Sequence, residues 1–80
     1  MNEQARRNIA DNLTRLRKYY WLTQKHVAKQ LGITESTLSH YENTGAVPDF
    51  RLEVLAWYYE VTPDSLIRPW SEVSKQLSPP

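Results

Sequence analysis

The stretch from Gln24 to Asn43, which reads QKHVAKQLGITESTLSHYEN, constrains the fold more than any other part of the sequence. Its apolar residues recur at a spacing that puts them on one side of two short helices meeting around Gly32. Helices that cross steeply over a short turn must approach closely, and Ala28 leaves room for the second helix. Gly32 can take the left-handed conformation that ends a helix. The residues expected to face inward are Val27, Leu31, Leu38 and Tyr41, with Ile33 filling the turn.

This arrangement is the helix-turn-helix motif, with its helices predicted over residues 24–31 and 35–43. Thr23 and Thr34 stand just before these helices, where a hydroxyl can accept a hydrogen bond from a free backbone N–H. A longer helix is predicted before the motif, over residues 3–20. Its inward side is expected to carry Ile9, Leu13, Leu16 and Tyr20, which recur at helical spacing.

Two further helices are predicted after the motif, over residues 50–59 and 63–67. The second begins at Thr62-Pro63-Asp64, a cap followed by proline and an acid in the first turn. The sequence thus predicts an all-α domain of five helices over residues 1–68, and no segment is predicted to be a strand. Residues 69–80 are predicted to be a short C-terminal tail, either a short helix carrying Val73 and Leu77 or a dimerisation segment.

Composition places this small domain among proteins without disulfides or membrane spans. The chain has 80 residues and no cysteine, and no apolar run approaches the roughly 20 residues that cross a bilayer. The N-terminus lacks the apolar core of a signal peptide, so a cytoplasmic, nucleoid-associated location is expected. Residues 1–30 contain seven basic and two acidic side chains, whereas residues 31–80 contain three basic and seven acidic ones. This asymmetry suits a basic face for nucleic acid, or else reflects ordinary solvated helices.

No pattern of catalytic or metal-binding residues is present. His26 and His40 are the only histidines, and the sequence contains no glycine-rich phosphate loop, zinc-ligand cluster or nucleophile motif. We therefore predict that the protein is not an enzyme and uses no cofactor or metal.

The motif and its flanks resemble the phage repressor/Cro-like helix-turn-helix family, also called the xenobiotic-response-element type. The resemblance covers about residues 9–67 and implies a lambda-repressor-like DNA-binding domain, whose third helix enters the major groove, usually as a dimer on a two-fold site. The segment at residues 43–51 departs from the family pattern by about a residue, in length or glycine placement. The residues that carry the resemblance are Leu16-Arg17, Leu22-Thr23-Gln24, Val27-Ala28, Leu31-Gly32-Ile33-Thr34, Ser36-Thr37-Leu38-Ser39, Tyr41-Glu42-Asn43, Gly45, Pro48, Leu52, Leu55-Ala56, Tyr59, Val61-Thr62 and Leu66.

The polar face of the second motif helix is the predicted site of base readout. Its side chains are Glu35, Ser36, Ser39 and His40. Glu35 is suited to accept from cytosine N4, the serines suit either base type, and His40 can donate to guanine. The alternative is an ordinary solvated helix face.

Backbone phosphates are predicted to contact the start of the first motif helix and both ends of the second. Free N–H groups and the helix dipole favour an anion at such a helix start. These contacts hold register and carry no sequence information directly. The predicted phosphate contacts are Gln24, Lys25, Thr34, Asn43 and Thr44.

Arg17 and Glu42 are interpreted as a structural pair. In the resembling family, residues at these two places form an ion pair that locks the first helix to the recognition helix. Direct contact of Arg17 with DNA is the alternative.

Trp57, Tyr58 and Trp70 are predicted to be exposed aromatic residues outside the core. Large exposed aromatics mark interfaces, so this set is a candidate homodimer or partner surface. Alternatively, the tail folds back and covers them within one molecule.

Together these features predict a transcriptional regulator, a repressor that binds double-stranded DNA as a homodimer on a palindromic site. The second hypothesis is a protein-interaction module on the same fold, an antitoxin or adaptor, with secondary or no DNA binding. The basic first half favours DNA, and the aromatic set favours a protein partner.

Overall fold

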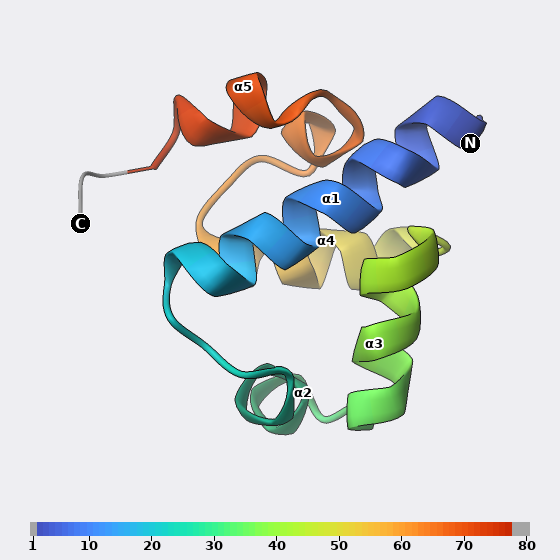
Figure 1. The fold of residues 1–80 in the computed structure, drawn as a ribbon, viewed down its shortest axis with the longest axis vertical. Coiled ribbons are helices and arrows are strands. Elements are labelled where there is room, and N and C mark those ends of the chain that lie inside the picture. The colour runs from blue at the N-terminus through green and yellow to red at the C-terminus, as the bar shows by residue number, and fades with distance from the viewer. Residues whose placement is uncertain (1, 78–80) are drawn as a thin grey trace.

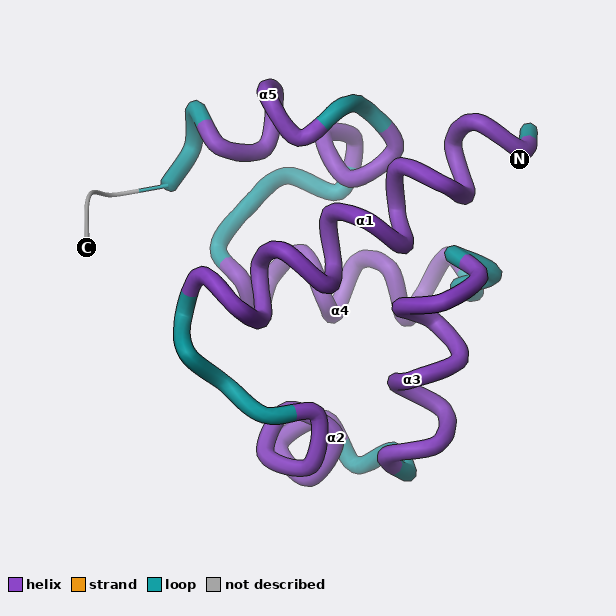
Figure 2. The backbone as a smooth tube through the Cα atoms, viewed as in Figure 1, coloured by secondary structure: helices purple, strands orange, loops and turns teal. Residues whose placement is uncertain are grey.

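The structure, a computed structural model, describes residues 2–77 as a set of helices around one core (Figures 1 and 2). In chain order the elements are α1 (Glu3–Tyr19), α2 (Gln24–Leu31), α3 (Glu35–Thr44), α4 (Asp49–Tyr59), the 3-10 helix η1 (Asp64–Ile67) and α5 (Trp70–Ser74). The described residues contain no strand, which confirms the predicted all-α class. Within the same residues, no helix combines the length and apolar character that crossing a membrane requires.

Polar caps and glycines set the ends of the first three helices. The side chains of Asn2, Thr23 and Thr34 each accept a hydrogen bond from the backbone N–H three residues later. The caps at Thr23 and Thr34 follow the prediction from their positions before the helices. Gly32 and Gly45 end α2 and α3 with φ of 69°, in the left-handed region. The turn between α2 and α3 is therefore encoded by a glycine at one side and a threonine cap at the other.

Gly45 is required for a second reason, because it packs directly against α1. A Cβ atom built at this position would overlap the backbone carbonyl of Arg6. The same atom at Gly32 would meet nothing. The loop after α3 can therefore lie against the first turns of α1 only because residue 45 has no side chain.

The helix-turn-helix pair packs under α1, with α2 and α3 crossing steeply. Figure 1 views α2 nearly along its axis, while α3 runs up the page beside it. Helix α1 contacts α3, η1 and α5, and thereby joins the motif to the C-terminal elements. The most deeply buried apolar side chains are Ile9, Leu13, Leu16, Val27, Leu38, Leu55, Ala56, Tyr59, Leu66 and Val73.

The C-terminal third has helices at both predicted places, and only the type of the first differs from the prediction. The helix predicted over residues 63–67 is the 3-10 helix η1, and the fifth α-helix is α5 in the predicted tail. Asn12 on α1 is fully buried, and its Nδ2 donates to the carbonyl oxygens of Leu66 (3.0 Å) and Arg68 (2.8 Å). The amide of Asn8 donates to Ile67 O at 3.0 Å. These bonds take up carbonyls at the end of η1 and hold it against α1.

The described part of the tail packs on the core. Val73 is fully buried and Leu77 is half-buried against the same cluster, while residues 78–80 lie outside the described residues. Helix α5 begins at Trp70, directly after Pro69.

Tyr20 is less buried than its predicted place in the core implies. Its side chain is 38% exposed. The ring stacks on Tyr59 with centroids 6.1 Å apart, and its hydroxyl donates to Tyr59 O at 3.1 Å. Tyr20 therefore joins the end of α1 to α4 at the edge of the core and does not fill the interior.

Candidate nucleic-acid interface

The outward side of α3 is polar and free of large apolar groups. Glu35, Ser36 and His40 are exposed and Ser39 is half-buried. The Nδ2 atom of Asn43 lies 3.5 Å from Ser39 Oγ, one turn apart on this side. The structure therefore brings the four predicted readout residues together on one helix.

The start of α2 offers free donors beside a cation. The backbone N–H of His26 donates to the capping hydroxyl, Thr23 Oγ1, at 3.0 Å. The N–H groups of Gln24 and Lys25 precede it and have no carbonyl one turn earlier to bond. The side chain of Lys25 is exposed. This helix start thus has the donors and the charge that suit a phosphate oxygen.

The remaining predicted phosphate contacts, Thr34, Asn43 and Thr44, are exposed at the two ends of α3. Thr34 is engaged in capping: its hydroxyl accepts from the Thr37 N–H at 3.0 Å and donates to Thr37 Oγ1 at 2.8 Å. The hydroxyl of Thr44 donates to His40 O at 2.8 Å and accepts from Ala46 N at 3.2 Å. Both hydroxyls therefore serve the ends of α3, and the backbone groups around them are what remain for a phosphate.

Arg17 and Glu42 form a largely buried ion pair between α1 and α3. Arg17 Nε donates to Glu42 Oε2 at 2.8 Å and Nη2 donates to Oε1 at 3.1 Å. The Glu42 side chain is only 3% exposed. Arg17 Nη1 also donates to Leu22 O at 2.9 Å, so the guanidinium spans the α1–α2 connection. The hydrogen bond to Glu42 raises the pKa of Arg17, against the opposing effect of burial.

Gln24 links this buried pair to the start of α2. Its Nε2 donates to Glu42 Oε1 at 3.1 Å. A side-chain amide has two N–H groups, so one can hold Glu42 while the other points elsewhere. The sequence places Gln24 at the helix start but gives no sign of this bond, because Glu42 lies 18 residues away.

Arg6 is a cation beside the interface that sequence reasoning did not single out. It lies with Gly45, Ala46 and Val47 around a shallow groove of about 350 Å³ at the end of α3. Figure 1 shows the N-terminal turns of α1 beside that end of α3. Within residues 2–77 its guanidinium makes no ion pair. The only sequence feature that points to this contact is Gly45, because a residue without a side chain lets the loop after α3 approach the backbone of Arg6.

The structure separates the three aromatic residues of the predicted partner surface. Trp57 and Tyr58 lie on α4 and line a groove against α2, whereas Trp70 lies on α5 with its ring 5.8 Å from the Arg15 guanidinium carbon. Figure 1 shows α5 and α2 at opposite ends of the molecule. Trp57 and Tyr58 therefore share a surface that does not include Trp70.

One comparison with known proteins gave a match, to a family model. The sequence model of the helix-turn-helix domain family matches residues 8–70, which include α2, α3 and their packing partners. The search of curated proteins and the search of solved structures each gave no match. Within residues 2–77, no three His, Asp or Glu side chains gather in a way that could hold a metal ion. The extent of the family match shows that the chain belongs to the helix-turn-helix domain family.

Proposed function

We propose that this protein is a transcriptional regulator of the repressor/Cro type that binds double-stranded DNA sequence-specifically, with α3 in the major groove. The observation that carries the proposal is the polar outward side of α3, held at a fixed angle by the buried Arg17–Glu42 pair. A recognition helix must be rigidly aimed, and its short polar side chains must reach base edges. Lys25 and Arg6 lie near opposite ends of the motif, where they can contact phosphates on either side of the groove.

A homodimer on an inverted repeat is the second part of the proposal. Two-fold dimers of such motifs place their recognition helices about 34 Å apart, one turn of DNA. The longest dimension of this molecule is 32 Å. Two copies side by side thus have a size that suits successive major grooves on one face of the duplex.

The test separates base readout from phosphate contact on a selected operator duplex and a scrambled duplex. We expect Ser36→Ala and His40→Ala to weaken operator binding by roughly 1 kcal/mol or more and to leave scrambled binding almost unchanged. Lys25→Ala should weaken both duplexes alike and lower the salt slope by about one. Equal effects of the α3 variants on both duplexes would contradict base readout by α3.

Lys25 is a cleaner probe than Gln24. Because Gln24 also holds Glu42, a Gln24→Ala protein changes folding and binding together. Lys18, an exposed lysine near the other end of α1 from Arg6, supplies the matched control: Lys18→Ala removes the same charge from a helix outside the motif.

A further inference from the structure

The outer side of α4 presents a row of apolar side chains to solvent. Phe50 is 63% exposed and Trp57 is 79% exposed, with Val54 between them. Their spacing of four and three residues puts them on one helix face. Exposed apolar surface gathered on one face, in contrast to scattered single residues, is typical of an interaction site.

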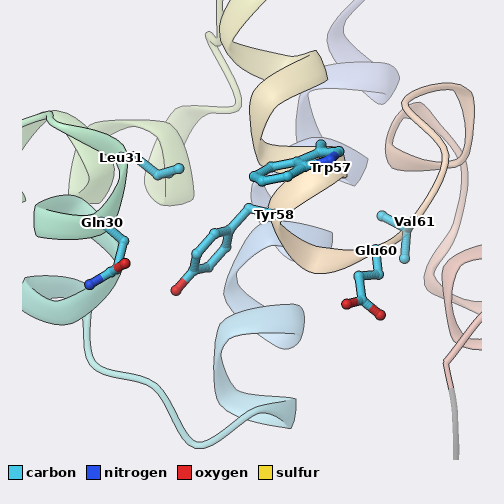
Figure 3. Close-up of a pocket in the computed structure, with 6 residues that line it drawn as sticks. All are labelled: Gln30, Leu31, Trp57, Tyr58, Glu60 and Val61. Carbon is cyan, nitrogen blue, oxygen red and sulfur yellow. The ribbon is translucent and has the colours of Figure 1, made fainter.

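A groove between α4 and α2 continues this face. It has a volume of about 680 Å³ and is lined by six residues. Figure 3 shows Trp57 and Tyr58 projecting from α4, Leu31 directed toward them from α2, and Glu60 beyond the last turn of α4. A second groove, of about 400 Å³, adjoins the first, because both include Tyr58 and Glu60 in their lining. The residues that line the first groove are Gln30, Leu31, Trp57, Tyr58, Glu60 and Val61.

Glu60 is an unfavourable residue for its position in the fold. It ends α4 with φ of 60°, in the left-handed region where glycine or asparagine is preferred. Its negative charge also lies at the negative end of the helix dipole. A residue that opposes local stability in two ways is a reason to look for a function at that place.

The net charge of this face is negative, because Glu53 and Glu60 outnumber Arg51. Within residues 2–77, neither Glu53 nor Glu60 takes part in an ion pair. Arg51, the basic residue of α4, has its guanidinium carbon 5.2 Å from the Phe50 ring centroid. Burial and the Glu60 carboxylate raise the pKa of Tyr20 at the adjoining groove. A phosphate backbone would be repelled here, whereas a cation can pair with a carboxylate and lie over an aromatic ring.

We propose that this face of α4, with its groove against α2, docks a basic, apolar segment of a different protein. Leucine-like side chains of that segment would fill the groove beside Leu31 and Trp57, and its arginines or lysines would meet Glu53 and Glu60. A second copy of this chain suits the surface less well, since a two-fold contact brings the same acidic patch against itself. The groove lies at the C-terminal end of α2, away from the donors at its start, so the partner and DNA can bind together.

The test is a selection of short random peptides displayed on phage against the purified full chain, followed by affinity measurements on the enriched peptides. We expect enrichment of arginine or lysine alternating with apolar residues at helical spacing. Trp57→Ala should weaken these peptides at least about tenfold, as removal of a central interface tryptophan does. Glu53→Gln with Glu60→Gln should weaken them about two- to fivefold, an effect that falls at high salt.

The control is Glu3→Gln with Glu72→Gln, which removes the same number of exposed carboxylates from α1 and α5, where they pair with Arg7 and Lys75. Equal loss with this control, unchanged binding to Trp57→Ala protein, or no basic enrichment would overturn the proposal. Sedimentation of the same variants tests whether a second copy of this chain binds the face. A dimer that Trp57→Ala dissociates would make this face a contact between copies and would also overturn the proposal. DNA binding measured in parallel is expected to stay unchanged, so the outcome is independent of the proposed function.

Discussion

At the scale of single residues, Glu42 joins three helices through one buried carboxylate. Arg17 on α1 and Gln24 on α2 both donate to it, and it belongs to α3. Thr14 Oγ1 lies 3.5 Å from Glu42 Oε1 and adds a weak fourth contact. The position of the candidate recognition helix relative to the rest of the molecule therefore depends on this side chain being paired.

Arg17→Met should lower the free energy of unfolding by roughly 3–5 kcal/mol, because it leaves the Glu42 carboxylate buried without its cation. Urea unfolding followed by circular dichroism measures the change. The control is Arg7→Met, which breaks the exposed pair with Glu3 and should cost less than about 1 kcal/mol. Similar losses in the two variants would show that the buried pair is not special.

Tyr59→Phe tests a buried hydroxyl. This hydroxyl has no hydrogen-bond partner within residues 2–77, so its removal at pH 7 should leave stability unchanged or raise it by up to about 1 kcal/mol. Burial is the first cause of the raised pKa of Tyr59, and Glu42 adds to it. The folded state therefore holds the hydroxyl proton of Tyr59 more tightly than the unfolded state does. This difference contributes fully to the free energy of unfolding below about pH 10, the ordinary pKa of tyrosine, and the contribution is lost as the pH rises further.

The free energy of unfolding, measured at pH 7 and above pH 10, therefore distinguishes the wild type from Tyr59→Phe. The wild type should lose stability between these conditions more steeply than the variant. Tyr20→Phe is the matched control, because it removes a hydroxyl that donates to Tyr59 O and should cost about 1 kcal/mol at pH 7. A large loss at pH 7 in Tyr59→Phe would mean that the hydroxyl is satisfied in the native protein.

At the scale of elements, the helix-turn-helix motif was the most predictable part of the fold. The caps at Thr23 and Thr34 and the left-handed Gly32 each leave a local signal, since they act within one turn of their own position. The 3-10 form of η1 leaves no such local signal in the sequence. It depends on Asn8 and Asn12, more than fifty residues earlier, and two asparagines on a helix look in sequence like ordinary polar surface.

The two glycines should respond differently to the same change. Gly45→Ala should lower the free energy of unfolding by about 2–5 kcal/mol, because it adds left-handed strain and a clash with the Arg6 backbone. Gly32→Ala should cost only the strain, about 1–2 kcal/mol. Thermal or urea unfolding of both proteins gives the comparison. Equal losses would contradict the close approach of the α3–α4 loop to α1.

The candidate site was predictable to the extent that it is local. The four readout residues follow from the period of α3 alone, whereas Arg6 and the Gln24–Glu42 bond join segments far apart in the chain. Trp57, Tyr58 and Trp70 were grouped because all are large aromatics, but α5 carries Trp70 onto the far side of α1 from α2. Composition identified the aromatics, and only the packing of helices shows which of them share a surface.

At the scale of the whole molecule, the two proposed binding surfaces differ in their unpaired charges. The exposed side of α4 carries unpaired carboxylates, while Arg6 and Lys25 flank the polar side of α3. The net charge of +1 is compatible with this local difference, because it sums over the whole chain. The basic part suits an electrostatic encounter with DNA, and the acidic part is directed to a protein partner in our proposal.

Selection of bound sequences from a random duplex library at moderate salt distinguishes sequence-specific from non-specific DNA binding. We predict enrichment of an inverted repeat, with half-sites about one helical turn apart, and binding that weakens steeply as salt rises. It further predicts that His40→Ala changes the enriched half-site. Salt-sensitive binding without enrichment of any sequence, or no binding at all, would contradict the claim that this protein is a sequence-specific regulator.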